Sequence, residues 1–587
     1  MSEKDAKSSR TPSVDRNASV PDIPSAAAFD DDSKVPFLTF RTFSMTVIVS
    51  IGGICFGYDT GQISGFLQME DFRYQFADDR EALELTPIRT GLLVATLSLG
   101  TLVGALIAGP LANNRRLGRK YSIVLWCIVF IIGNCFQIAA QYPFWWVMMF
   151  GRIISGFAIG GLSVMVPAYQ GESAPTHLRG AIVCCYQLFI TIGILIAYLI
   201  NFGTESIPGS ASWRIPVGIS YFWAIVLGAG ILFFPETSRH EFRHGKVDSA
   251  AASIAKFYGV STRHKVVKRQ LEEMQEKLRI EQEGGDHSIW EVFTGPRMAY
   301  RTLLGVNAYQ LVNSAIQALQ QMTGANFFFY YGTTIFASVG LDNSFVTQII
   351  LGAVNVVTTF PGLYMVEKFG RRKCLGLGAA WMFMCFMVFA SLGYFQLEAP
   401  DGSNRSSIGM VMIIFACLFI AAFASTWGPM AWAVTSEIYP SRYRSTCIAF
   451  CAASNWAFNF FIGFATPFIE ADIGFSYGYL FAACNFIAVL VVYFFLPETS
   501  GKSLEEIDTM FLLEIKPWKS SKWVPPPPED LVTADHLRLT SGGREIMKKD
   551  EAGEATNVQY ENLKDTPQND SNVMMTGGVR GNSITQA

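Results

Sequence analysis

The residues best suited to bind a ligand are uncharged amides within one apolar stretch of the sequence. Gln317, Gln320 and Gln321 are spaced i, i+3 and i+4, so in a helix they share one face. Gly324 permits that helix to break before Asn326. Because each amide has a donor end and an acceptor end, the four together can replace water around the hydroxyl groups of a neutral ligand. The alternative is that they only join helices, as polar side chains inside membranes also do.

A carboxylate and a guanidinium form a second chemical feature. Asp59 lies six residues from the end of the first apolar stretch, about 9 Å deep at 1.5 Å per residue, and Arg152 lies about 12 Å deep in the fourth stretch. Ionisable groups inside a membrane are costly and commonly functional, so the similar depths predict a pair. A pair that loosens when Asp59 is protonated would couple proton movement to a conformational change. A permanent structural ion pair is the alternative.

Membrane-spanning helices must position these residues. Hydrophobic residues make up 50% of the chain and charged residues 16%, against roughly 25% charged residues in soluble domains. Apolar runs of about 20 residues, long enough to cross a bilayer, predict an all-α membrane protein with twelve transmembrane helices and the lipid bilayer as a partner. The predicted spans are residues 43–65, 90–111, 121–140, 144–166, 180–201 and 213–234, then 303–336, 343–366, 374–394, 408–437, 445–468 and 477–496.

Polar segments separate the two sets of spans and end the chain. Neither end has apolar periodicity, and the start lacks the basic and then apolar pattern of a cleaved signal. The predicted parts are a disordered N-terminal tail over 1–40, a six-helix bundle over 41–234, a helical linker over 235–300, a second bundle over 301–510 and a disordered C-terminal tail over 511–587.

The distribution of charge predicts the orientation. Lys and Arg cluster at 115–120, after the second span, and at 368–373, after the eighth, whereas the loop over 66–88 is acidic on balance. Because short cytoplasmic loops retain the cations, both termini and the linker are predicted to be cytoplasmic. Asn404, in an Asn-Arg-Ser sequence on the opposite side, is a candidate glycosylation site.

An internal repeat relates the two bundles. A Pro-Glu-Thr-Ser sequence ends the first half at 235–238 and the second at 497–500, and a Glu lies seven residues before an Arg after both the fourth and the tenth spans. A Gly-Arg-Lys turn at 118–120 matches a Gly-Arg-Arg turn at 370–372. The repeat predicts two six-helix bundles about an axis along the membrane normal, with a site between them that faces either side in turn.

From about residue 40 to about 510 the sequence resembles the sugar porter family of the major facilitator superfamily. The stretches that carry the resemblance are GGICFGYDTG at 52–61, GR at 151–152, PAYQGE at 167–172, APTHLRG at 174–180, QQMTGAN at 320–326 and PETSGKSLEE at 497–506. FFFYYG at 327–332 and TWGPMAW at 426–432 are most similar to fungal hexose transporters. One departure lies in the loop over 109–120, where Asn stands in place of the family's usual acidic residue.

The resemblance implies roles for further residues. It extends the polar lining of a sugar site beyond the four amides to Gln187, Asn355, Asn455 and Asn459. Trp432 would stack on the apolar face of the sugar ring, although aromatic side chains inside membranes often only pack. Charged residues at the inner helix ends would act as latches between spans in the outward-facing state, with membrane topology alone as the alternative. These are Glu172, Arg179, Glu236, Arg239, Glu367, Arg371, Glu437, Arg444 and Glu498.

The sequence therefore predicts a hexose transporter, for glucose in the first instance, that works by alternating access as a proton symporter in the plasma membrane. A facilitative uniporter and a glucose receptor that signals without transport are the alternatives. An enzyme, a cofactor and a metal are not expected, since no nucleophile with a base, metal-ligand cluster or phosphate-binding loop is present. A formal charge of −3 gives no reason to expect nucleic acid as a partner.

Overall fold

The computed structural model describes residues 29–79, 81–112, 117–283, 312–338, 343–398, 405–439, 444–512 and 515–524, together with Pro21 and Ile23. Its helices in the first half and the linker are α1 (Phe40–Phe66), α2 (Glu70–Phe76), α3 (Pro87–Ala112), α4 (Gly118–Ala139), α5 (Trp145–Ser173), α6 (Arg179–Thr204), α7 (Ala211–Ile231), α8 (Ser238–Arg243), α9 (Val247–Tyr258) and α10 (Lys265–Glu283). Those of the second half are α13 (Val312–Met322), α14 (Ala325–Ser338), α15 (Ser344–Lys368), α16 (Arg371–Phe395), α17 (Ser406–Ser425), α18 (Trp427–Ile438), α19 (Arg444–Ile473), α20 (Tyr477–Phe495) and α21 (Leu504–Leu512), with short 3₁₀ helices η2 (Gly474–Ser476) and η3 (Pro517–Lys522).

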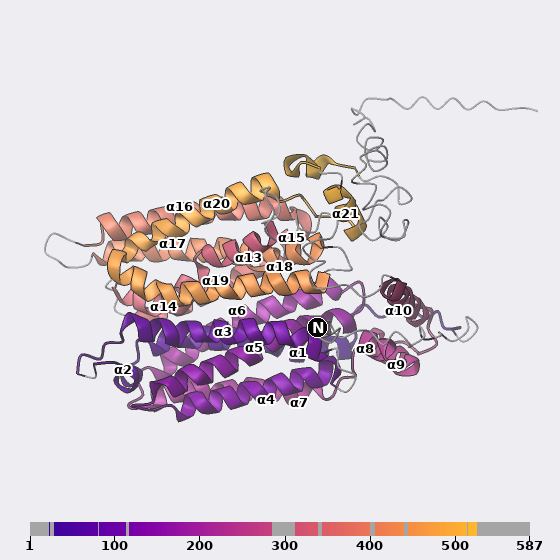
Figure 1. The fold of residues 1–587 in the computed structure, drawn as a ribbon, viewed down its shortest axis with the longest axis horizontal. Helices are drawn as coiled ribbons and strands as arrows, with labels where there is room; N and C mark the ends of the chain where they lie inside the picture. Colours follow the sequence, from indigo (N-terminus) through magenta and orange to yellow (C-terminus); the bar gives the residue numbers. More distant parts are fainter. Residues whose placement is uncertain are drawn as a thin grey trace, which may run out of the picture.

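The long helices form two bundles that lie side by side (Figure 1). Ten described helical stretches are long and apolar enough to cross a membrane. The last, Cys447–Phe495, contains both α19 and α20, and the broken pair α13–α14 makes one more span. The described helices thus account for twelve spans: α1 and α3–α7 in the N-terminal bundle, and the helices from α13 to α20 in the C-terminal bundle.

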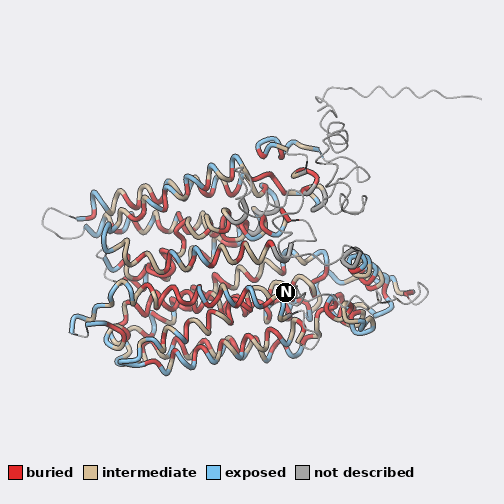
Figure 2. Tube along the Cα trace, viewed as in Figure 1, coloured by how far each residue is buried: buried red, intermediate tan, exposed pale blue. Residues whose placement is uncertain are grey.

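One apolar core lies within the N-terminal bundle, whereas the core of the C-terminal bundle continues into N-terminal residues such as Phe66, Val94 and Trp213. Glycines allow the helices to pack closely. A Cβ atom at Gly57 of α1 would overlap the carbonyl oxygen of Ile190 on α6, and one at Gly156 of α5 would overlap that of Leu97 on α3. These contacts fix α1 and α5, the helices that carry Asp59 and Arg152. Buried residues lie mainly on the inward sides of the helices, and exposed residues gather at their ends and outer sides (Figure 2).

Two spans are broken near the middle of the C-terminal bundle. The break predicted at Gly324 is present: α13 ends at Met322, α14 begins at Ala325, and Gly324 has a φ of +94° that favours glycine. The second break lies at Thr426, between α17 and α18 and two residues before Gly428. Pro429 is tolerated in the first turn of α18, where its missing N–H would have no helical partner.

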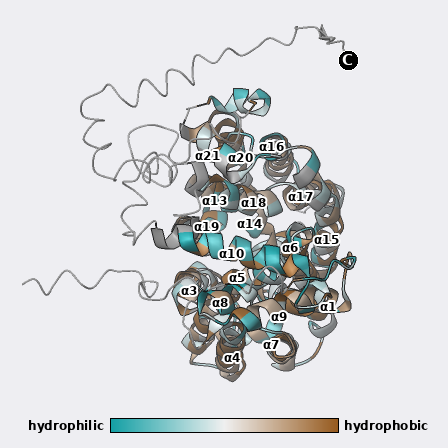
Figure 3. Ribbon diagram, turned by 90° about the vertical axis from the view of Figure 1, so that its right-hand side faces the viewer, coloured by the Kyte–Doolittle hydropathy of each residue, from teal (hydrophilic) through white to brown (hydrophobic). Residues whose placement is uncertain are grey.

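The linker helices α8–α10 lie at one end of the bundles, which we call the linker end, and α2 lies at the other, which we call the α2 end (Figures 1 and 3). The tail over 1–40 was predicted to be disordered throughout, but its residues 29–39 pack on the linker helices. Phe29 is buried in an apolar cluster with Ile254 and Tyr258, and the Asp32 carboxylate accepts a hydrogen bond from Lys265 Nζ at 2.6 Å.

The predicted disordered tail over 511–587 also begins with structure, since α21 reaches Leu512 and η3 packs against α20. Residues 525–587, most of residues 1–28, the candidate glycosylation site at Asn404 and residues 113–116 of the unusual loop lie outside the described residues.

Candidate functional site

Amide side chains from α13, α14 and α19 form one hydrogen-bonded network beside the break at Gly324. Asn455 Nδ2 donates to the Oε1 atoms of Gln317 and Gln320, at 2.7 Å in each case. Gln321 Nε2 donates to Asn455 Oδ1 at 2.8 Å, and Asn326 Nδ2 donates to Gln321 Oε1. The face predicted from the i, i+3, i+4 spacing is therefore formed, and its amides are bonded to one another.

The network has a buried side and a more open side. Gln317 Nε2 donates to Ala431 O at 3.2 Å, and Gln320 Nε2 donates to Trp427 O at 2.9 Å, so both side chains are buried and join α13 to α18. Gln321 and Asn326 are only half-buried. Gln317 and Gln320 thus make the interhelical bonds expected under the alternative interpretation, whereas Gln321 and Asn326 retain surface for a ligand.

Asn459 connects the network to the N-terminal bundle. Its Oδ1 accepts hydrogen bonds from Ser98 Oγ on α3 at 2.6 Å and from the Tyr330 hydroxyl on α14 at 2.8 Å. Its Nδ2 donates to Gln321 Oε1 at 3.3 Å. Ser98 is absent from the predicted residues, because one hydroxyl in an apolar stretch has no distinguishing pattern. Tyr330 lies in the FFFYYG stretch at 327–332, but no role was predicted for it.

The other three predicted lining residues lie on neighbouring helices and outside this network. Gln187 of α6 is half-buried, and a Cβ atom at Gly428 would lie 3.8 Å from its Nε2 atom. Asn355 of α15 is buried one turn from Gly352, which packs against α6, and its side chain makes no hydrogen bond to the described residues. Trp432 of α18 is 36% exposed.

The predicted pair of ionisable residues is present inside the N-terminal bundle. Arg152 Nη1 lies 4.0 Å from Asp59 Oδ1, and both side chains are fully buried. The carboxylate also accepts hydrogen bonds from Gln62 Nε2 and, at 3.4 Å, from Ser155 Oγ. Within the described part of the chain, the Arg152 guanidinium donates no hydrogen bond. The pair is therefore loose, and its two hydrogen-bonding neighbours are absent from the predicted residues.

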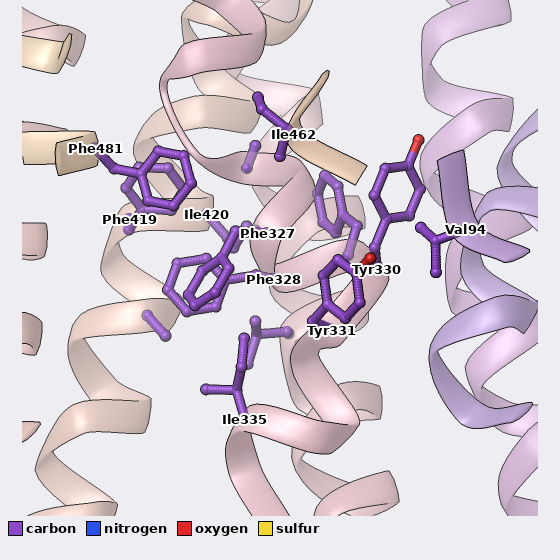
Figure 4. Close-up of a cluster of buried hydrophobic side chains, with 14 of the residues drawn as sticks. Val94, Phe327, Phe328, Tyr330, Tyr331, Ile335, Phe419, Ile420, Ile462 and Phe481 are labelled. Atoms are coloured by element: carbon purple, nitrogen blue, oxygen red, sulfur yellow. The ribbon is translucent and has the colours of Figure 1, made fainter. Parts of the chain in front are cut away.

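Polar contacts join the two bundles toward the α2 end. The Ser64 hydroxyl of α1 lies 3.1 Å from the Thr333 hydroxyl of α14 and accepts a hydrogen bond from Gln348 Nε2 of α15 at 3.0 Å. Tyr330 lies on the side of α14 toward Val94 of α3, whereas Phe328 points into the C-terminal bundle (Figure 4). The bundles are thus in contact from the amide network to the α2 end.

The charged residues of the repeat make equivalent pairs at the linker end of each bundle. Arg119 Nε lies 3.3 Å from Glu172 Oε2, and Arg371 Nη2 lies 3.0 Å from Glu437 Oε1. These pairs join helices of the same bundle. Arg179 and Arg239 line a pocket with Glu172 and with Glu273 of α10, and the side chains of Glu367 and Arg444 lie outside the described part of the chain.

The glutamates of the two Pro-Glu-Thr-Ser sequences accept hydrogen bonds from helix N-termini. Glu236 accepts from Arg119 N at 3.1 Å, and Glu498 accepts from Arg371 N at 2.7 Å. A carboxylate at a helix N-terminus meets unpaired N–H groups and the positive end of the helix dipole. Burial nevertheless raises the pKa of Glu236. Among the described residues, the repeated motifs therefore bond helices to one another within each bundle.

Twelve spans in two repeated bundles, with a polar site where the bundles meet, define a membrane transporter fold. Residues 45–511 match the family described as "Sugar (and other) transporter", and the chain belongs to this family, which is one of transporters and not of enzymes. The resemblance to sugar porters and the predicted all-α, twelve-span fold are confirmed.

Named relatives and a solved structure are similar over most of the chain. It is 44% identical to a low-affinity glucose transporter of Kluyveromyces lactis, over 82% of this chain and 84% of the relative. It is 42% identical to the high-affinity fructose transporter ght6 of Schizosaccharomyces pombe, over 82% of this chain and 89% of the relative. The fold is similar to that of the proton:xylose symporter XylE bound to 6-bromo-6-deoxy-D-glucose, with a TM-score of 0.65 and 26% identity over 80% of this chain and 98% of that chain.

Proposed function

We propose that this protein carries a hexose, with glucose as the first candidate, across the plasma membrane by alternating access, with both termini in the cytoplasm. The relatives named above are glucose and fructose transporters. The observation that carries the proposal is the amide network at the helix break, because Gln321 and Asn326 offer uncharged donors and acceptors to hydroxyl groups.

The amides of the network have different roles in binding. Gln321 and Asn326 bind the sugar, while Asn455 and Gln320 hold Gln321 in place through their mutual hydrogen bonds. Gln187 and Asn355 complete the polar lining from α6 and α15, and Trp432 stacks on the apolar face of the sugar ring. Broken helices suit this task because their flexible ends can rearrange around a ligand.

Alternating access requires contacts that open and close at the two ends in turn. The Ser64 and Thr333 hydroxyls, 3.1 Å apart, close the α2 end. When the α2 end opens, charged groups at the linker end, including Arg179, Arg239 and Glu498, latch the bundles together. With the α2 end closed by these contacts, the described arrangement is inward-facing.

Sugar movement is coupled to a proton at Asp59. The carboxylate is fully buried, and its contact with Arg152 is at the outer limit for an ion pair. A guanidinium inside a membrane is costly when its counter-charge is 4.0 Å away and it donates no hydrogen bond to the described residues, which favours a functional role over a purely structural one. Protonation of Asp59 would remove its attraction for Arg152 and free α1 and α5 to move. A facilitative uniporter with a structural pair at this position is the second candidate.

Uptake of labelled glucose in cells that lack their own hexose transporters tests the proposal, with and without a protonophore. If the protein is a symporter, the protonophore abolishes uptake of glucose against its concentration gradient. If it is a uniporter, the protonophore leaves glucose uptake unchanged. A receptor that binds without transport gives no uptake although the protein reaches the cell surface.

A further inference from the structure

The segment after α21 folds back onto the linker end of α20. Its short 3₁₀ helix η3 is held by Ser520, whose buried hydroxyl accepts a hydrogen bond from Glu498 N at 2.8 Å and donates one to Pro517 O at 2.6 Å. Pro517 is also buried. The position of η3 relative to the bundle is therefore fixed by buried contacts, although the segment belongs to a polar tail.

An aromatic contact places η3 at the level where the α20 span ends. The Trp518 ring packs edge-on against Phe494 of α20, with ring centroids 6.3 Å apart. Phe494 lies in the last turn of the span and is 44% exposed, and Trp518 is 41% exposed. Exposed aromatic rings at the end of a span are typical of the membrane–water interface, where Trp is enriched. Trp518 therefore lies at the edge of the bilayer.

Three lysines lie along one side of this segment. A 3₁₀ helix has 3.0 residues per turn, so side chains at i and i+3 eclipse one another. Lys519 and Lys522 have this spacing within η3, Lys516 is the residue immediately before it, and all three are exposed. None of the three makes an ion pair with the described residues, and Lys516 Nζ lies 5.8 Å from the Trp518 ring centroid.

A further cation lies on α16, next to the end of α20. The Arg372 guanidinium stacks on the Tyr493 ring at 5.1 Å and donates a hydrogen bond to Tyr493 O at 2.8 Å. Tyr493 is the neighbour of Phe494, so the arginine lies at the same level of the bundle as Trp518. Among the described residues, this end of α20 thus combines exposed aromatic rings with three lysines that make no ion pair and with the guanidinium of Arg372.

We propose that Lys516, Lys519 and Lys522, with Trp518 and Arg372, form a docking site for the headgroups of anionic phospholipids. The charge of the lysine row is complementary to such headgroups, and the Trp518 contact brings the row to the height at which they lie. Basic residues next to a span attract anionic lipid by about 1 kcal/mol for each Lys or Arg near the surface. The site would anchor the C-terminal segment to the leaflet at the linker end.

The test uses the full-length protein in nanodiscs of phosphatidylcholine with a minor fraction of phosphatidylserine. Native mass spectrometry counts the lipids of each kind that remain bound after release, in the absence of sugar. Wild type is expected to retain phosphatidylserine well above its share of the membrane. The triple variant Lys516→Gln/Lys519→Gln/Lys522→Gln should lose affinity by up to about fivefold for each lysine removed.

The matched control removes the same charge elsewhere at the linker end, as Lys34→Gln/Lys246→Gln/Lys256→Gln, and should retain lipid as wild type does, since these three exposed lysines make no ion pair with the described residues. High salt should weaken retention much more in wild type than in the η3 variant, which keeps only Arg372 of the charged groups, and a folding defect would not produce this difference. Equal retention by the η3 variant and wild type would overturn the proposal, as would wild-type retention without preference for the anionic lipid. Because no sugar is present, neither outcome depends on the transport activity.

Discussion

Asp59 of α1 and Arg152 of α5 approach to 4.0 Å inside the N-terminal bundle, and both are fully buried. The carboxylate is bonded to Gln62 and Ser155, whereas the guanidinium donates no hydrogen bond to the described residues. The distance is long for two opposite charges in a low dielectric, so the ion pair is weak in this conformation. A small change in the charge of Asp59 can therefore alter how α1 and α5 pack.

The substitution Asp59→Asn should abolish accumulation of sugar against its gradient while sugar binding survives. Asparagine keeps the shape and hydrogen-bonding reach of the carboxyl group but cannot titrate, so it imitates the protonated state. Exchange of sugar across the membrane should persist, because exchange does not require the proton to leave. Parallel assays of accumulation and exchange in proteoliposomes check this. A mutant that still accumulates sugar would place the coupling site elsewhere.

Loss of the Gln321 side chain should weaken sugar binding. Gln321→Ala leaves sugar hydroxyls unpaired in a site that excludes water, at a cost of about 1–3 kcal/mol, or roughly five- to hundredfold in affinity. Delivery to the membrane should be normal. Gln317→Ala is the informative comparison, because Gln317 bonds α18 and should affect stability more than affinity. Unchanged affinity in a delivered Gln321→Ala protein would remove this residue from the site.

The contact between Ser64 and Thr333 should set the balance between the two conformations. Thr333→Val keeps the side-chain shape but removes a hydroxyl that bonds across the bundles, so the α2 end should open more often. One net hydrogen bond of about 0.5–1.5 kcal/mol corresponds to a shift of roughly two- to tenfold.

Labelling of a cysteine introduced at Val94, which is buried where α3 meets α19, measures the opening in wild type and Thr333→Val backgrounds. Thr358→Val is the control, since the Thr358 hydroxyl bonds only within its own helix, to Val354 O at 2.7 Å. Equal labelling of all three proteins would argue against a closing role for Thr333.

The sequence predicted much of this arrangement because periodicity and span length determine which helices form and which faces they share. It predicted the break at Gly324 and the approach of Asp59 to Arg152. It could not separate Gln317, which bonds α18, from Gln321, which stays half-buried, because helical spacing gives a face but not the neighbour that each side chain meets.

The contacts between the bundles could not be predicted from the sequence either. Ser64, Ser98 and Ser155 are single hydroxyls in apolar stretches, and such residues most often bond their own helix. Their hydrogen-bond partners lie on helices that are distant in the sequence. In the proposed transport cycle, the hydrogen bonds between the bundles form in only one conformation. The packing of residues 29–39 depends on pairs such as Asp32 with Lys265, which a polar composition does not reveal.

Residues 1–20 and residues 21–35 should differ in how much they contribute to the stability of the protein. Deletion of residues 1–20 should leave uptake per delivered molecule near normal. Deletion of residues 1–35 also removes Phe29 and Asp32, which pack on the linker helices, and should lower the thermal stability and the amount delivered. Surface quantification and thermal unfolding of both variants check this. If the longer deletion behaves like the shorter one, the packing of residues 29–35 makes no contribution to stability.

The most direct test of the account measures glucose inside proteoliposomes that contain the purified protein under an imposed pH gradient and membrane potential. One proton moved inward contributes about 2.3 kcal/mol per 100 mV and about 1.36 kcal/mol for each unit of pH difference, enough to concentrate a neutral sugar many-fold. A proton symporter should raise glucose above its outside concentration, and the glucose should fall back when a protonophore is added. Glucose that only equilibrates would show a uniporter and contradict the coupling at Asp59. Glucose that enters no faster than into protein-free liposomes would contradict the proposed transport of glucose itself.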